Sequence, residues 1–154
     1  MVSKQLISRI QDLVAKATEL KNRYITDKQA PVNYACIFTQ SEDEFVELCS
    51  LAKEFGSVIK ETDKGPIFKI EPLATDAGVL QLLKIRRPDA EHPDLGDADF
   101  TIKDFDVFQN KYLGQSGFKL IQKENFVMME LMESGCDVRV YFSHPPLDEQ
   151  FNIK

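Results

Sequence analysis

The chain has 154 residues, of which 43% are hydrophobic and 29% charged, values typical of a globular protein rather than a disordered one. Its formal net charge of −6 argues against nucleic acid as a partner, because nucleic-acid binding depends on Lys and Arg side chains that neutralise phosphates. It has no apolar run near the roughly 20 residues that a membrane span needs, and its charged N-terminus is unlike a signal peptide, so we expect a soluble, cytoplasmic protein.

Residues 1–30 are predicted to form an amphipathic helix and a polar connector. The helix covers residues 3–25, and Ser3 is its expected N-cap. Apolar residues recur at spacings of three and four and therefore share one face of this helix: Leu6, Ile10, Leu13, Ala17, Leu20 and Tyr24. That face has to be buried, either against the rest of the chain or against a second copy of the protein.

Residues 31–90 are predicted to form a first module of one strand, one helix and three more strands. The helix at 41–55 is the most clearly marked element, because Ser41 and Glu44 form a capping box at its start and Gly56 follows its end. The strands are expected at 33–39, 57–61, 66–70 and 79–86.

Residues 91–154 are predicted to repeat this order in a second module and to end in a tail. The helix of this module begins after the N-cap Asp104 and ends at Gly114. The tail after Pro146 is expected to be a surface extension. The strands are expected at 98–102, 118–123, 126–132 and 136–143.

The two modules share their order of elements and also the positions of the glycine and proline residues that end these elements. Gly56 corresponds to Gly114, and Pro88 to Pro145, with an offset of about 57 residues. One such module leaves exposed sheet edges and is marginal alone, whereas two modules can join their sheets. The sequence therefore predicts an α+β fold in which two βαβββ modules form a cupped mixed sheet, with an extra N-terminal helix.

Polar residues alternate with apolar ones along the strands of the second module. Because strand side chains alternate between faces, the apolar face should pack on the helix and the polar face should line a concave surface. Arg86, at the exit of a strand of the first module, is a further candidate for gripping an anion. The concave surface is expected to hold Asp97, Asp99, Glu130, Arg139 and Tyr141.

Two interpretations of this concave surface stay open. In the first, it binds a small polar or anionic ligand, and the planar fork of Arg139 grips a carboxylate or phosphate. In the second, Asp99 and Arg139 pair with each other across neighbouring strands or simply face water.

The stretch HPDLGDADF, residues 92–100, gathers oxygen and nitrogen ligands at close spacing. Such oxygen-rich sets suit Ca²⁺ or Mg²⁺, although the spacing is not that of an EF-hand loop. His-Pro-Asp is also typical of a turn, here in the linker between the modules. The candidate ligands for a divalent metal are His92, Asp94, Asp97 and Asp99.

The paired βαβββ order and the tract GDADFTIKDF, residues 96–105, resemble the glyoxalase, bleomycin-resistance and extradiol-dioxygenase superfamily, also called the vicinal oxygen chelate superfamily. The tract VRVYFSHPPL, residues 138–147, is also similar to uncharacterised prokaryotic proteins. The superfamily resemblance covers residues 33–143 and implies a cupped sheet around a divalent metal. Its ligands would be His, Glu or Gln on the first and fourth strand of each module.

The positions that correspond to those ligands carry other residue types in this chain. The first strands offer Asn33 or Tyr34 in one module and Asp97 or Asp99 in the other. The fourth strands offer positively charged residues, which repel a metal cation and argue that the metal site is lost: Lys84 or Arg86, and Arg139.

Three functions follow as expectations, and whether the protein is an enzyme stays open. The first is binding of a small polar or anionic molecule in the concave pocket, without catalysis and without a cofactor. The second is a divalent-metal-dependent lyase, isomerase or dioxygenase of the vicinal oxygen chelate type. The third is a homodimeric protein-interaction module that uses the N-terminal helix.

Overall fold

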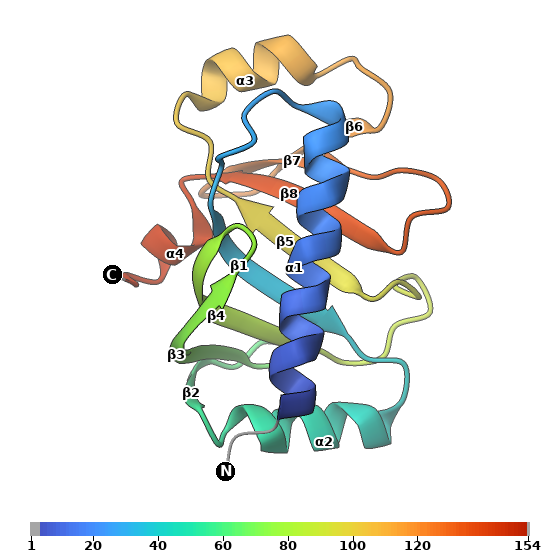
Figure 1. The fold of residues 1–154 in the computed structure, drawn as a ribbon, viewed down its shortest axis with the longest axis vertical. Helices are drawn as coiled ribbons and strands as arrows, with labels where there is room; N and C mark the ends of the chain where they lie inside the picture. Colours follow the sequence, from blue (N-terminus) through green and yellow to red (C-terminus); the bar gives the residue numbers. More distant parts are fainter. Residues whose placement is uncertain (1–3, 154) are drawn as a thin grey trace.

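In a computed structural model, which describes residues 4–153, the chain forms one eight-stranded mixed sheet with helices packed around it (Figure 1). The expected cap residue Ser3 lies outside the described residues. The first helix and the first module comprise α1 (Lys4–Tyr24), β1 (Val32–Phe38), α2 (Glu42–Ala52), β2 (Gly56–Lys60), β3 (Ile67–Thr75) and β4 (Gly78–Arg86). The second module and the tail comprise β5 (Gly96–Phe100), α3 (Phe105–Tyr112), β6 (Phe118–Gln122), β7 (Val127–Leu131), β8 (Val138–His144) and α4 (Leu147–Gln150).

The sheet has the order β2-β3-β4-β1-β5-β8-β7-β6, so the same arrangement occurs on both sides of its centre. In each module the first strand pairs in parallel with the last, β1 with β4 and β5 with β8. The modules join where β1 and β5 pair antiparallel, which removes one edge from each. The predicted α+β fold of two βαβββ modules with an extra N-terminal helix is confirmed.

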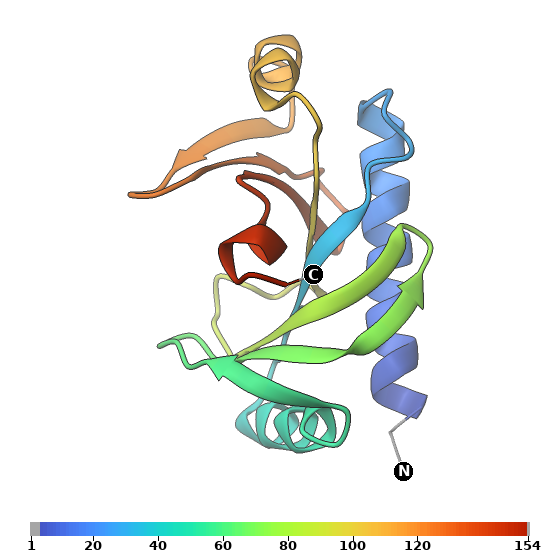
Figure 2. The same cartoon turned by 90° about the vertical axis from the view of Figure 1, so that its left-hand side faces the viewer.

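The sheet is curved, and its two faces are covered differently. Figure 2 shows α1 along the convex side, whereas the C-terminal α4 lies on the opposite side, between the two halves of the sheet. α4 contacts β1, and Pro146 before it is buried. The expectation that the tail after Pro146 is only a surface extension is therefore wrong, since this segment packs inside the cup.

The apolar face of α1 is taken up by the chain itself. The helix contacts β1, β3, β5 and β8. Its stripe is at most 3% exposed: Leu6, Ile10, Leu13, Val14, Ala17 and Leu20. This burial corrects the alternative in which the helix offers that stripe to a second copy. None of the described helices combines the length and the apolarity that crossing a bilayer requires.

The two module helices begin at the predicted caps. The Ser41 hydroxyl accepts a hydrogen bond from the Glu44 backbone N–H at 3.1 Å, and Asp104 accepts one from the Val107 N–H at 3.2 Å. The Glu44 carboxylate reaches back to the Gln40 N–H at 2.7 Å, one residue earlier than a standard capping box requires. One orphan N–H group at the start of α2, that of Glu44, and the N–H of Gln40 just before the cap are thus satisfied.

The Ser41 cap can be tested by substitution. We expect Ser41→Ala to lower the free energy of unfolding by about 1 kcal/mol, because the Glu44 N–H loses its acceptor. Urea denaturation measures this change. Ser50→Ala, at an exposed position of the same helix, is the control and should cause no loss. Equal destabilisation by both substitutions would contradict the cap assignment.

Candidate ligand-binding site

A pocket of about 390 Å³ lies on the concave face, between the two halves of the sheet and the C-terminal segment. This volume falls in the range of small-molecule sites, about 300–1,000 Å³. Its polar lining comes from both modules: Tyr34, Lys60, Lys84, Arg86, His92, Asp97, Asp99, Lys123, Tyr141 and Gln150. Its apolar lining is formed by Ile67, Ile121, Phe126, Met128, Leu147 and Phe151.

Asp99 forms part of the pocket floor and is completely buried. Its carboxylate accepts hydrogen bonds from Asn33 Nδ2 at 3.0 Å, from the Ser143 backbone N–H at 3.1 Å and from the Ser143 hydroxyl. Burial raises the pKa of Asp99 to about 6, although these hydrogen bonds lower it. Asp99 is therefore a structural carboxylate whose oxygen atoms are already used by neighbouring strands.

Asp97 differs from Asp99 because one of its oxygens has no partner. It is 9% exposed, and its Oδ1 is buried without a hydrogen bond from any part of the chain that the structure describes. Burial and the neighbouring Asp99 raise the pKa of Asp97 to about 8, although the positive charge of Lys84 acts in the opposite direction. Asp97 is thus protonated at neutral pH and presents a carboxylic acid group.

Lys84 and Arg86 lie on the same face of β4 and line the pocket beside these carboxyl groups. The Arg86 Nε atom is buried and has no acceptor within residues 4–153. Lys84 is only partly buried, and no hydrogen bond or ion pair engages its Nζ atom within the same residues. The Nη2 atom of Arg86 lies 3.1 Å from Asp89 Oδ2. Burial lowers the pKa of Lys84, since the charged form loses water contacts. Two cationic side chains therefore offer unused N–H donors to the pocket.

The predicted ligand residues divide into two groups. Arg86, Asp97, Asp99 and Tyr141 line the pocket as expected from the alternation of faces. Glu130 is not among the lining residues, and its carboxylate accepts a hydrogen bond from the Tyr141 hydroxyl at 2.7 Å.

Arg139 is held away from the pocket by the linker between the modules. Its Nε and Nη2 atoms donate to Asp94 at 2.7 and 3.1 Å, and Nη2 also donates to the Glu91 carbonyl at 2.9 Å. The guanidinium stands over the Phe38 ring, 5.4 Å from its centroid. The alternative in which Arg139 pairs with Asp99 is wrong, because Asp94 is its partner. Its Nε and Nη2 donors are therefore not free for a ligand carboxylate or phosphate.

Three of the four residues suggested for a metal are engaged in separate contacts, and the fourth, Asp97, has a buried Oδ1 atom without a partner among the described residues. His92 Nδ1 lies 3.1 Å from Asp89 Oδ2, while Asp94 binds Arg139 and Asp99 binds its own neighbours. Burial lowers the pKa of His92, as does the nearby Arg86. Across the described residues, no three His, Cys, Asp or Glu side chains are grouped to hold a metal ion.

The metal implied by the superfamily resemblance does not fit the residues present. On the fourth strands, where a ligand would be needed, β4 supplies Lys84 and Arg86, and β8 supplies Arg139. Cations at these positions would repel a divalent metal rather than coordinate it.

Sequence reasoning named Lys84 only at a superfamily ligand position and not as an anion-binding residue, and it missed Lys60, Lys123 and the residues of the C-terminal segment. Lys84 could have been found, since it lies two positions before Arg86 and shares its face. Leu147, Gln150 and Phe151 carry no periodic signal that places them in the cup.

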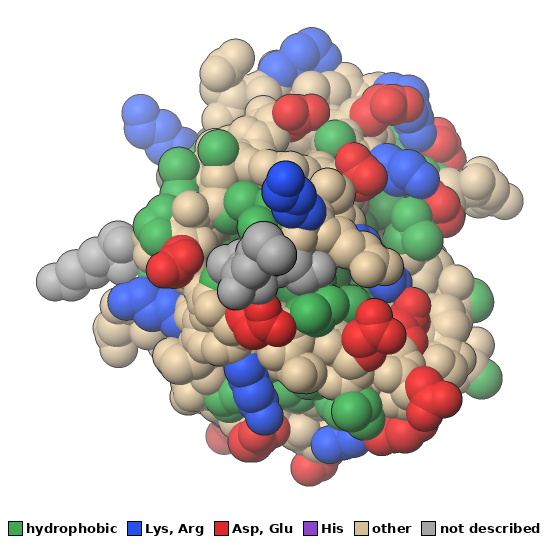
Figure 3. All heavy atoms as spheres, turned by 60° about the horizontal axis from the view of Figure 1, so that its bottom comes forward, with side chains coloured by type: hydrophobic (Ala, Val, Ile, Leu, Met, Phe, Trp, Pro, Cys, Tyr) green, Lys and Arg blue, Asp and Glu red, His purple; other side chains and the backbone are tan. Residues whose placement is uncertain are grey.

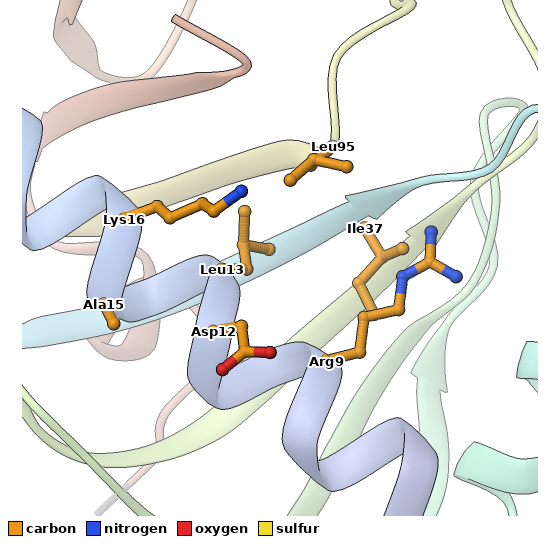
Figure 4. A pocket seen from close by; sticks show the side chains of 7 residues that line it. All are labelled: Arg9, Asp12, Leu13, Ala15, Lys16, Ile37 and Leu95. Atoms are coloured by element: carbon orange, nitrogen blue, oxygen red, sulfur yellow. The ribbon is translucent and has the colours of Figure 1, made fainter.

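A second hollow lies on the convex side, beside α1. Figure 4 shows it between α1, the end of β1 and the residue before β5. Its volume is about 300 Å³. Its basic residues are already paired, Arg9 with Glu44 at 3.0 Å and Lys16 with Asp137 at 3.4 Å. The concave pocket is the better candidate, because its cationic donors are unused.

The outer surface viewed in Figure 3 carries mixed charge. Acidic and basic side chains are interspersed there, and apolar atoms appear in small groups. Large apolar residues that are exposed come from separate elements: Val46, Ile59, Val79, Leu95, Val107, Leu113 and Met132. Exposed apolar residues scattered in this way are normal for a folded surface.

Comparisons with known proteins report on the fold alone. No protein-family model matches the chain, and no curated protein matches it. A solved structure described as "Structural Genomics, Protein EC4020" is similar, with a TM-score of 0.73 at 10% sequence identity. The match covers 97% of this chain and 91% of that chain, so the whole arrangement of helix and paired modules recurs in that protein.

Proposed function

We propose that this protein binds a small anion in the concave pocket, as a binding protein rather than a catalyst. The observation that carries the proposal is that Lys84 and Arg86 line the pocket together: Arg86 Nε is buried without an acceptor among the described residues, and no hydrogen bond or ion pair joins Lys84 Nζ to them. Donors buried without a partner cost free energy, and native proteins keep few of them. An anionic ligand with acceptor oxygens would satisfy both donors.

The charge of the lining supports an anion rather than a cation. Four basic side chains line the pocket against two carboxyl groups, and of the four only Arg86 has a carboxylate partner among the described residues, Asp89 outside the lining. One of these carboxyl groups, Asp97, is mostly neutral at pH 7 because its pKa is about 8. The pocket is therefore positive within a protein of net charge −6. The protonated Asp97 can also donate a hydrogen bond to an anion, which an ionised carboxylate cannot.

Two further groups near the carboxyl pair support binding over nucleophilic catalysis. Burial raises the pKa of Cys36 and of Tyr34 well above their usual ranges. The thiol and the phenol therefore stay protonated at neutral pH, whereas the thiolate is the nucleophilic form of cysteine. A metal-dependent lyase, isomerase or dioxygenase has no support from this lining, since the fourth-strand positions carry Lys and Arg.

The proposal is tested by anion binding to the full chain and to Lys84→Met, which removes the charge but keeps an unbranched side chain. Acetate and inorganic phosphate are titrated by calorimetry. We expect Lys84→Met to weaken the binding of both anions by about tenfold or more, equivalent to ~1.4 kcal/mol. Lys103→Met, at an exposed position outside the pocket, should bind like the wild type. No binding of either anion, or equal binding by Lys84→Met, would reject the proposal.

A further inference from the structure

The two ends of the concave pocket differ in chemistry. Three of its four basic residues come from the first module, Lys60 at the end of β2 and Lys84 and Arg86 on β4. The second module and the C-terminal segment supply the fourth basic residue, Lys123, and most of the apolar lining. We call this apolar lining the apolar end: Ile121, Phe126, Met128, Leu147 and Phe151.

The apolar end is only partly covered by the chain itself. All five of its residues are of intermediate exposure, whereas Ile67 at the basic end is buried. When a ligand covers apolar surface inside a pocket and removes it from water, the complex is stabilised by roughly 25 cal/mol per Å². A small inorganic anion bound at Lys84 would leave the apolar end of the pocket exposed to water.

The C-terminal segment connects the two ends. The Nζ atom of Lys60 stands over the Phe151 ring, 5.8 Å from its centroid, so β2 of the first module touches the segment that follows α4. Gln150 Nε2 donates to the Pro145 carbonyl at 2.7 Å and ties α4 to the end of β8. The segment thus forms a wall along the pocket from its basic end to its apolar end.

We propose that the ligand is an amphipathic anion, with a carboxylate or phosphate head at Lys84 and Arg86 and an alkyl or aryl body against Met128 and the C-terminal segment. This inference rests on the proposed anion binding and adds the chemical class of the ligand. The head satisfies the unused donors of β4. The body covers apolar atoms of β6, β7 and the residues around α4.

Acetate, hexanoate and hexanol separate the contributions of head and body in calorimetric titrations of the full chain. We expect hexanoate to bind about tenfold or more tightly than acetate, because each buried methylene strengthens binding several-fold. Hexanol, which has the body without the charge, should bind more weakly than hexanoate. A phenyl phosphate and inorganic phosphate pair extends the comparison to the other head group.

Met128→Gln tests the apolar end, with Met132→Gln as the matched control at an exposed position just after the same strand. Met128→Gln should lose most of the gain of hexanoate over acetate while binding acetate like the wild type. Phe151→Ser should have the same effect. Because Phe151 lies outside the regular elements, this variant tests the apolar end even if Met128→Gln disturbs the folding of its strand. Met132→Gln should retain the gain.

The outcomes distinguish this inference from the proposed function. If acetate and phosphate bind through Lys84 but the apolar body adds nothing, the amphipathic ligand is rejected and anion binding stands. If no anion binds, the proposed function fails and the inference fails with it. If hexanol binds as tightly as hexanoate and Lys84→Met changes neither, the pocket takes neutral apolar molecules and both proposals are overturned.

Discussion

Replacing Arg139 with methionine is expected to lower the free energy of unfolding by about 3 kcal/mol, because Asp94 would be left nearly buried without its partner. The two side chains are only 12% and 10% exposed, and two hydrogen bonds join them. Burial is the largest influence on Asp94 and opposes its ionised form, yet the hydrogen bonds and charge of Arg139, together with a backbone hydrogen bond, lower the pKa of Asp94. The pair fastens the linker between the modules to β8.

Urea denaturation of the wild type and three variants checks this expectation. Asp94→Leu combined with Arg139→Met should recover part of the loss, since removing both charges leaves no unpaired ion in the interior. Arg9→Met is the control for a more exposed pair, as Arg9 and Glu44 are each 31% exposed, and it should cost less than about 1 kcal/mol. If Arg139→Met is as mild as Arg9→Met, the Asp94 pair contributes no more than an exposed pair does.

Arg139 also shows where sequence reasoning succeeds and where it stops. The alternation of apolar and polar residues along β8 placed Arg139 correctly on the face opposite the helices. Its partner could not be predicted, because Asp94 lies in a linker of 9 residues between β4 and β5 that has no periodic pattern. Whether a charged residue meets a ligand or an ion pair depends on such tertiary contacts.

The fold was predictable because its signals are local and repeated. Capping residues mark the starts of α2 and α3, and buried and half-buried residues alternate along most of β8. The start of β5 was placed two residues late, since Gly96 looks like a turn residue. A side chain at Gly96 would meet the Cys36 carbonyl of β1, so the glycine permits close pairing at the centre of the sheet. The sequence alone does not reveal which backbone approaches it.

The candidate site was predictable only in part. Strand alternation places Asp97, Asp99 and Tyr141 on the concave face, and the same rule extended to β4 would have added Lys84. The burial of the two aspartates could not be foreseen, because it depends on the joining of the modules and on the segment around α4. That segment is a helix of 4 residues, too short for a hydrophobic period to mark it.

Asp97→Asn is expected to make the protein more stable than the wild type at pH 8 and to leave its stability nearly unchanged at pH 4. The pKa of Asp97 is raised from 3.8 to about 8 in the folded protein, with burial as the main cause. Between these two values the folded state binds the proton more tightly than the unfolded state does. Folding stability therefore falls as pH rises through this window and is lowest once Asp97 is ionised in both states.

The substitution removes this pH-dependent loss, because asparagine keeps the shape of the side chain and stays neutral. A tenfold change in an acid dissociation constant corresponds to about 1.4 kcal/mol, so the advantage of Asp97→Asn at pH 8 should be at least this large. Urea denaturation at pH 4, 6 and 8 measures it. Asp12→Asn, at an exposed position of α1, should follow the wild type at every pH.

Asp99 remains in both proteins, so its own titration, with a pKa of about 6, cancels in the comparison to first order. A stability difference that does not widen with pH would mean that Asp97 is not a buried acid, and the protonated donor would be lost from the proposed anion site. A difference that widens as expected would show that the chain keeps an acid at a position where asparagine folds better. The protein would then keep Asp97 although this residue lowers its stability. The position of Asp97 beside Lys84 and Arg86 in the pocket explains this, since anion binding would use the protonated acid.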